Sequence, residues 1–102
     1  MSYHIFIQNN PELAFLKTKA LQAEGKLIHQ VFFYSTVLAC LKDLAFIKQW
    51  NILLPKSGIL KICSEGFTKD LLNKHPVPGF TPAGLVNFFA EHARNQGDVL
   101  QF

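Results

Sequence analysis

Apolar residues in this chain occur in short runs, separated by segments in which apolar residues recur at helical spacing. Short runs that are rich in β-branched and aromatic residues predict strands. Four segments fit this description: residues 3–8, 27–34, 59–63 and 98–102. Residues 31–34 are apolar throughout, which is typical of a strand buried on both faces, as in a parallel sheet.

The first helix is predicted between the first two strands. Asn10 is a good N-cap and Pro11 suits the first helical position. Gly25 follows the last periodic residue and fits a C-terminal cap. The predicted apolar stripe consists of Leu13, Leu16, Ala20 and Leu21.

Three further helices are predicted. The second lies within residues 37–54 and is clearest over 41–53. A turn and a short helix are expected over residues 64–74. The last helix is expected to be capped by Thr81, with Pro82 at its first position. Its predicted apolar stripe consists of Leu85, Val86, Phe89 and Ala93.

Strands and helices alternate along the whole chain, which predicts an α/β fold. The expectation is a three-layer α/β/α sandwich with a parallel sheet of four to five strands, built by one domain over residues 1–102. Ligands and reactive groups in such sheets lie at the carboxyl ends of the strands. Cys63 ends the third predicted strand and is therefore expected at such a position.

Composition narrows the function classes. Hydrophobic residues make up 49% of the chain and charged residues 17%, which indicates a folded globular protein. The net charge of +3 is not clustered, so direct nucleic-acid binding is not expected. Without an apolar run near the roughly 20 residues that span a bilayer, or a recognisable signal peptide, we expect a cytoplasmic protein with no membrane association. The 10 Phe favour an apolar surface that another subunit covers.

Cys63 is the candidate catalytic residue. It ends a predicted strand and precedes a predicted helix, and a helix N-terminus stabilises a thiolate. Lys61 and Lys69 would add positive charge nearby, whereas Glu65 would oppose them. The alternative is that Cys63 is a small buried hydrophobe, as free cysteine often is.

Other candidate residues have weaker patterns. Cys40 lies in an apolar helical segment, which favours a place in the core or an interface over a relay role. His4 and His29 lie in predicted strands and are expected to pack there, and His92 is expected near the surface of the last helix. His75 is expected in a solvated loop rather than at the site. There is no C-x-x-C pair and the histidines are isolated, so no metal site is expected.

Three segments carry a family resemblance. Residues 21–25 are followed by the run at 31–34, Val-Phe-Phe-Tyr, and Trp50 is followed thirteen residues later by Cys63. The third segment combines Gly79-Phe80-Thr81, Gly84-Leu85 and the final residues 98–102. In this order and spacing, these segments resemble the DsrE/TusD family of small sulfur-relay proteins, and most closely its TusD branch.

The resemblance implies a parallel sheet flanked by helices, and assembly with paralogous subunits or with itself. In the TusD branch, the cysteine at the position of Cys63 accepts sulfur as a persulfide and passes it on, without a cofactor. That relay serves 2-thiolation of the wobble uridine in certain tRNAs, and DsrE-branch complexes act in sulfur-oxidising metabolism. The chain would thus be a sulfurtransferase-type carrier whose partners are cysteine-bearing donor and acceptor proteins.

Two other functions stay open from the sequence. One is a non-catalytic structural subunit of a DsrE-type complex, and the other is an unrelated small α/β binding module. Family members usually carry a longer loop after the first strand, whereas only Asn9 and Asn10 separate strand from helix here. The segment after Tyr34 is also compressed. Both segments lie at carboxyl ends of strands, near the expected site.

Overall fold

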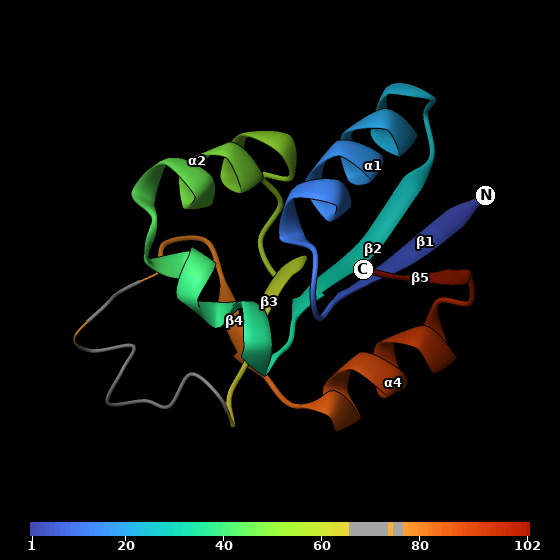
Figure 1. Ribbon diagram of the computed structural model, residues 1–102. Helices are drawn as coiled ribbons and strands as arrows, with labels where there is room; N and C mark the ends of the chain where they lie inside the picture. The colour runs from blue at the N-terminus through green and yellow to red at the C-terminus, as the bar shows by residue number, and fades with distance from the viewer. Residues whose placement is uncertain (66–73, 75–76) are drawn as a thin grey trace.

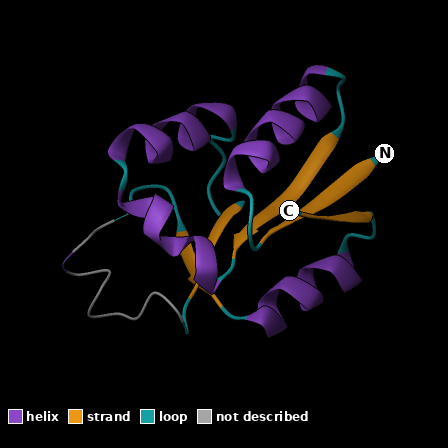
Figure 2. Ribbon diagram, viewed as in Figure 1, coloured by secondary structure: helices purple, strands orange, loops and turns teal. Residues whose placement is uncertain are grey.

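The computed structural model describes residues 1–65, 74 and 77–102, which form alternating strands and helices (Figure 1; Figure 2). The elements are β1 (Ser2–Ile7), α1 (Pro11–Ala23), β2 (Leu27–Phe33), the 3-10 helix η1 (Ser35–Lys42), α2 (Leu44–Leu53), β3 (Leu60–Cys63), β4 (Thr81–Ala83), α4 (Leu85–Arg94) and β5 (Asp98–Gln101). Most of the short helix expected over residues 64–74 lies outside the described residues. Within the described part of the chain, no helix is long and apolar enough to cross a membrane.

The described strands form one parallel sheet in the order β4-β3-β2-β1-β5. The predicted parallel sheet is therefore confirmed, with five strands. The pairing of β1 with β2 shifts by one residue: Tyr3 lies opposite Ile28, but His4 lies opposite Gln30. His29 is the extra residue of this bulge. The shift places His4 and Gln30 side by side.

Helices cover both faces of the sheet (Figure 1): α1 and α2 lie on one face and α4 lies on the other. The larger apolar cluster packs between the sheet and the α1 and α2 layer, and it includes Phe33 and Trp50. A smaller cluster lies under α4 and contains Phe32. Phe32 and Phe33 are adjacent and both are 0% exposed, because successive side chains of a strand point to opposite faces. This arrangement is the predicted three-layer α/β/α sandwich.

α1 begins as predicted but buries a different stripe. Asn10 caps the helix, since its Oδ1 accepts a hydrogen bond from the backbone N–H of Leu13 (3.1 Å). The buried residues of the helix are Ala14, Thr18 and Leu21. Leu13 and Leu16, which were predicted to be buried, are 51% and 63% exposed. Leu21 is buried as predicted, whereas Ala20 of the predicted stripe is exposed, so the buried side of the helix runs through Ala14, Thr18 and Leu21.

The single helix expected within residues 37–54 is two elements. η1 ends at Lys42, and Asp43 adopts an extended backbone before α2 starts at Leu44. The Asp43 carboxylate accepts hydrogen bonds from the backbone N–H groups of Ala45 (3.0 Å) and Phe46 (3.4 Å). The prediction over 41–53 was therefore wrong before Leu44, because a capping aspartate interrupts a continuous apolar pattern.

The last helix begins later than predicted. Thr81 and Pro82 belong to β4, an edge strand that pairs with β3, and Gly84 occupies the N-cap of α4. An edge strand tolerates proline because one side of its backbone needs no partner. The prediction that Thr81 caps a helix with Pro82 at its first position was therefore wrong.

α4 also presents a different side to the sheet than predicted. Phe88 is its buried residue, at 2% exposure, and Leu85 is half-buried one turn earlier. Val86 and Phe89, two members of the predicted stripe, are 79% and 62% exposed. Since residues three apart share a helix face, the Leu85 and Phe88 side is the one that packs on the sheet.

Candidate functional site

Cys63 is the last residue of β3 and lies at the carboxyl edge of the parallel sheet. It pairs with Ala83 of β4, and the Ser64 N–H donates a hydrogen bond to the Ala83 carbonyl (2.9 Å). Ligands and reactive groups collect at this edge of parallel sheets. The strand thus holds the candidate thiol at the predicted place, while its catalytic role stays a prediction.

The Cys63 side chain is buried, with 2% exposure. It belongs to a cluster with Phe32, Ala83 and Phe88, which we call the thiol cluster. Phe88 comes from α4, so this helix contributes a side chain to the buried cluster that contains the sulfur. A reagent or partner reaches the sulfur only when part of this cover moves.

Both cysteines are free thiols. Cys40 is half-buried and lies in η1, on a different element from Cys63. The two cysteines are therefore held on separate parts of the chain.

The charged groups expected beside Cys63 are arranged differently. Lys61 points to the same side of β3 as Cys63, but its ammonium donates to Gln30 Oε1 (3.0 Å). Glu65 is exposed, and Lys69 lies outside the described residues. Most of the helix expected after Cys63 also lies outside the described residues, so the effect of its N-terminus on the thiol stays a prediction.

A polar network lies under α4, formed by His4 of β1, Gln30 of β2 and Lys61 of β3. His4 and Gln30 are both 0% exposed. Gln30 Nε2 lies 2.8 Å from His4 Nδ1 and also donates to the Phe88 carbonyl (3.0 Å). Lys61 Nζ donates to Gln30 Oε1, and His4 Nε2 lies 2.5 Å from the Asn95 carbonyl oxygen. The network therefore joins three strands to two backbone carbonyls of α4, one inside the helix at Phe88 and one at its C-cap, Asn95.

The partners of this network fix its protons. The Asn95 carbonyl only accepts, so His4 Nε2 carries a hydrogen. The Lys61 ammonium only donates, so the Gln30 oxygen faces it and the Gln30 amide N–H groups face His4 and α4. His4 is therefore a neutral imidazole that donates from Nε2 and accepts at Nδ1.

Burial controls the protonation of His4. Desolvation lowers the pKa of His4, while the bond to Asn95 partly offsets this effect. His29 and His92 lower the same pKa further, because their ring centroids lie 4.9 Å and 4.8 Å from that of His4. Glu91 acts in the opposite direction. The neutral form of His4 is the one that suits the folded protein.

The charged residues beside the network form a short chain. Burial lowers the pKa of Lys61, Glu91 opposes this shift, and Arg94 adds to it. The hydrogen bond from Arg94 lowers the pKa of Glu91 (2.6 Å). This pair is on the surface, where an ion pair adds little to stability.

Sequence reasoning missed the polar network. It correctly expected His4 to pack in a strand, but it did not connect His4 with Gln30 or Lys61. The sequence carries one signal for it: His4 and Gln30 each stand two positions before a Phe in their strands. Residues two apart share a face of a strand, so both polar side chains are on the same face as an apolar one. The bulge at His29 hides the pairing, since register is not readable from one strand alone. His75 lies outside the described residues.

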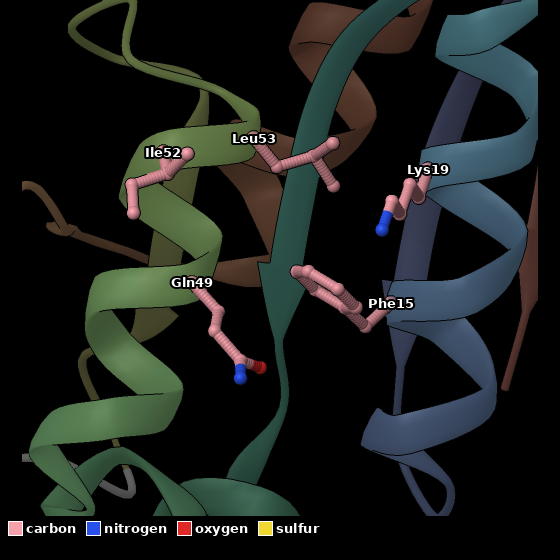
Figure 3. Close-up of a pocket in the computed structure, with 5 residues that line it drawn as sticks. All are labelled: Phe15, Lys19, Gln49, Ile52 and Leu53. Carbon is pink, nitrogen blue, oxygen red and sulfur yellow. The ribbon is translucent and has the colours of Figure 1, made fainter.

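A hollow of about 280 Å³ lies between α1 and α2, and Figure 3 shows its lining. These two helices lie on the sheet face opposite to α4 (Figure 1). The hollow is lined by Phe15, Lys19, Gln49, Ile52 and Leu53. Its lining is largely apolar and does not include Cys63, so it is separate from the thiol cluster. Across residues 1–65, 74 and 77–102, no group of three or more His, Cys, Asp or Glu is placed to hold a metal ion.

In comparisons with known proteins, neither a protein-family model nor a curated protein matches this chain. The resemblance to the DsrE/TusD family therefore stays a prediction from the sequence.

Proposed function

We propose that this protein is a sulfur-carrier subunit, which accepts a persulfide sulfur on Cys63 and passes it to an acceptor cysteine. The proposed pathway is 2-thiolation of the tRNA wobble uridine or related sulfur metabolism. One observation carries the proposal beyond the resemblance: Cys63 ends β3 at the carboxyl edge of an all-parallel sheet. This is the edge at which α/β proteins place reactive groups.

The proposed transfer is a thiol–persulfide exchange. The Cys63 thiolate attacks the outer sulfur of a donor cysteine persulfide, and a new S–S bond forms as the donor's S–S bond breaks. The donor leaves as a thiolate, and the terminal sulfur on Cys63 takes up a proton. The number of S–S bonds is unchanged, so the exchange needs no oxidant, reductant or metal. Transfer to the acceptor repeats the same exchange in the opposite sense.

The proposed partners are cysteine-bearing donor and acceptor proteins, together with paralogous DsrE-type subunits or a second copy of the chain. Large apolar side chains at the surface support assembly, because they are costly to leave in water. Leu16, Ile52 and Phe89 are between 62% and 71% exposed. The two free thiols agree with a reducing compartment, and the cytoplasm is the compartment that we propose.

A second candidate is a non-catalytic structural subunit of a DsrE-type complex. The burial of Cys63 favours it, because a thiol at 2% exposure in an apolar cluster behaves as a small hydrophobe. In that case the fold alone would carry the function, and the sulfur atom would only fill space under α4.

The experiment that separates these candidates is sulfur loading. A cysteine desulfurase with cysteine supplies persulfide sulfur, and intact-protein mass spectrometry detects a gain of about 32 Da for one sulfur. We expect the gain in wild type and in Cys40→Ser, with its loss in Cys63→Ser. The two substitutions form a matched pair, since each removes one free thiol. If Cys40→Ser gains no sulfur while a known carrier loads in the same mixture, the carrier proposal is wrong.

A further inference from the structure

We propose that α4 is a proton-controlled cover for Cys63: neutral His4 holds the helix on the sheet, and protonation of His4 releases it. The inference rests on the proposed function for its purpose, since it explains how a buried thiol becomes available. The release of α4 itself does not depend on sulfur transfer. It concerns the attachment of α4 and the exposure of the thiol cluster.

The covering role follows from what α4 places over the sulfur. Phe88 is 2% exposed and belongs to the thiol cluster with Cys63 and Phe32. The Phe88 ring also packs edge-on against Phe32, with centroids 5.7 Å apart. In the part of the chain that the structure describes, α4 is the one helix on this face of the sheet (Figure 1). If α4 moves away, the thiol cluster loses Phe88, and we infer that Cys63 then becomes more accessible.

The attachment of α4 depends on side chains of the sheet. Gln30 donates to the Phe88 carbonyl inside the helix, and His4 donates to the Asn95 carbonyl at its C-cap. Both donors are buried and converge on each other, with Gln30 Nε2 2.8 Å from His4 Nδ1. The two anchors therefore share one hydrogen-bond arrangement, and a change in His4 affects both.

That arrangement has no room for a second proton on His4. A proton on Nδ1 would face the amide N–H of Gln30, so two donors would meet. Gln30 cannot turn its oxygen toward His4 without presenting N–H groups to Lys61, which is also a donor. The same turn would place the oxygen next to the Phe88 carbonyl. Each alternative leaves buried groups unpaired, which is expensive.

The groups around His4 add to this effect. On β2, His29 stacks on His4, and on α4, His92 meets it edge-on, so any of these rings that are charged repel one another. Lys61 of β3 lies beyond Gln30. Glu91 of α4 is the acidic group that acts on His4, and its carboxylate is bonded to neighbours on the helix.

Two other charged residues, Arg94 and Asp98, lie near this region, but neither is hydrogen-bonded to His4. Arg94 is one of the neighbours that bond Glu91. On β5, His4 pairs with Val99, and Asp98 stands one position earlier, opposite Tyr3. The environment as a whole favours a neutral ring, in agreement with the lowered pKa of His4.

The direction of the pH effect follows from linkage. With α4 released, His4 is open to water and has an ordinary pKa of about 6.5, whereas its pKa is lower under the helix. Protons therefore bind the open state more tightly, and the open population rises as pH falls below about 6.5. At about pH 5, the open-to-closed ratio would rise up to about thirty-fold over its neutral value.

The test measures exposure of Cys63 as a function of pH in the Cys40→Ser chain. A dipyridyl disulfide labels the thiol, and each rate is divided by the rate for the unfolded chain at the same pH. We expect the normalised rate to rise between about pH 7.5 and about pH 5, by up to about thirty-fold. Over this interval, amide hydrogen exchange should show lost protection in α4 while β2 stays protected. A flat normalised rate, or loss of protection in α4 and β2 together, overturns the proposal.

Three variants separate His4 from the other histidines. His4→Asn keeps an acceptor toward Gln30 but does not titrate, so its normalised rate should be independent of pH. His29→Asn is the matched control on the neighbouring strand and should keep the rise. Lys61→Met removes one of the two obstacles to turning the Gln30 oxygen toward a protonated His4 and leaves the other, the Phe88 carbonyl, so the rise should shrink but not vanish. A rise in His4→Asn equal to that of wild type overturns the proposal. If His4→Asn does not fold, an undiminished rise in Lys61→Met overturns it.

Sulfur loading is not part of this readout, so the two proposals can fail separately. A Cys63 that opens with acid but never gains sulfur would refute the carrier proposal alone. A Cys63 that gains sulfur at a pH-independent normalised exposure would refute the cover alone.

Discussion

Gln30 is the residue on which the α4 side of the sheet depends most. Its amide donates to the Phe88 carbonyl and toward His4 Nδ1, while its oxygen accepts from Lys61. Every polar atom of this buried side chain therefore has a partner, and each partner is itself confined. A fully satisfied network of this kind specifies one arrangement of the elements that it joins.

Substitution of Gln30 tests this network. In Gln30→Leu, the side chain keeps its bulk but leaves the Lys61 ammonium, His4 Nδ1 and the Phe88 carbonyl without their partner. We expect a loss of about 1–3 kcal/mol in unfolding free energy, the usual cost of one buried group left unpaired, since Lys61 is only part-buried and the Phe88 carbonyl lies inside the helix. Urea denaturation followed by the fluorescence of Trp50 measures the loss.

The matched control is Gln22→Leu, at an exposed position of α1. A surface substitution of this kind should change the unfolding free energy by less than about 0.5 kcal/mol. Equal stabilities for Gln30→Leu and Gln22→Leu would show that the polar network does not hold the α4 face.

At the residue scale, the sequence predicted what depends on local chemistry. Asn10 caps α1 through a hydrogen bond three residues along the chain, so its role is visible in the sequence. The contact between His4 and Gln30 depends on the register of two strands and on a bulge between them. Strand register is a property of the assembled sheet, so neither residue reveals its partner alone.

At the element scale, two local signals had more than one structural meaning. Thr81 followed by Pro82 matches a helix start, yet it also matches an edge strand, and the structure has β4 there. Residues 81–83 form a strand because the free edge of β3 can pair with one more strand. At Asp43, the apolar pattern predicted one continuous helix, but the aspartate caps α2 and separates it from η1.

Asp43→Ala tests whether this cap decides where α2 begins. The Asp43 carboxylate accepts from Ala45 and Phe46, and loss of an N-cap typically costs about 1 kcal/mol. We expect that loss in urea denaturation, with most of it restored in Asp43→Asn, which keeps an acceptor oxygen at the same position. If the two variants were equally destabilised, the cap would not be the cause.

At the scale of the whole molecule, the two helical layers are unequal. α1, η1 and α2 contribute to the large apolar cluster, whereas the smaller cluster under α4 contains Cys63. Alternation of strands and helices was enough to predict the three-layer sandwich, because parallel strands need helical connections. The alternation could not predict that Cys63 lies in the smaller cluster under α4, since that depends on which face of the sheet each helix covers.

Because the cluster around Cys63 is the smaller one, we expect Cys63 to become accessible by release of part of the structure, without global unfolding. Regions with few buried apolar contacts open at lower free energy than the core of a protein. Such an opening exposes little surface, so its denaturant dependence is shallow compared with that of unfolding.

The most direct measurement is the labelling rate of Cys63 in native Cys40→Ser, across a series of low urea concentrations. Global unfolding is followed in the same samples by Trp50 fluorescence, because Trp50 lies in the large cluster on the other face. We predict labelling that is faster than unfolding and depends only weakly on urea. Labelling that matches the unfolding rate and its urea dependence would show that Cys63 is a core residue, and would contradict its exposure by local release.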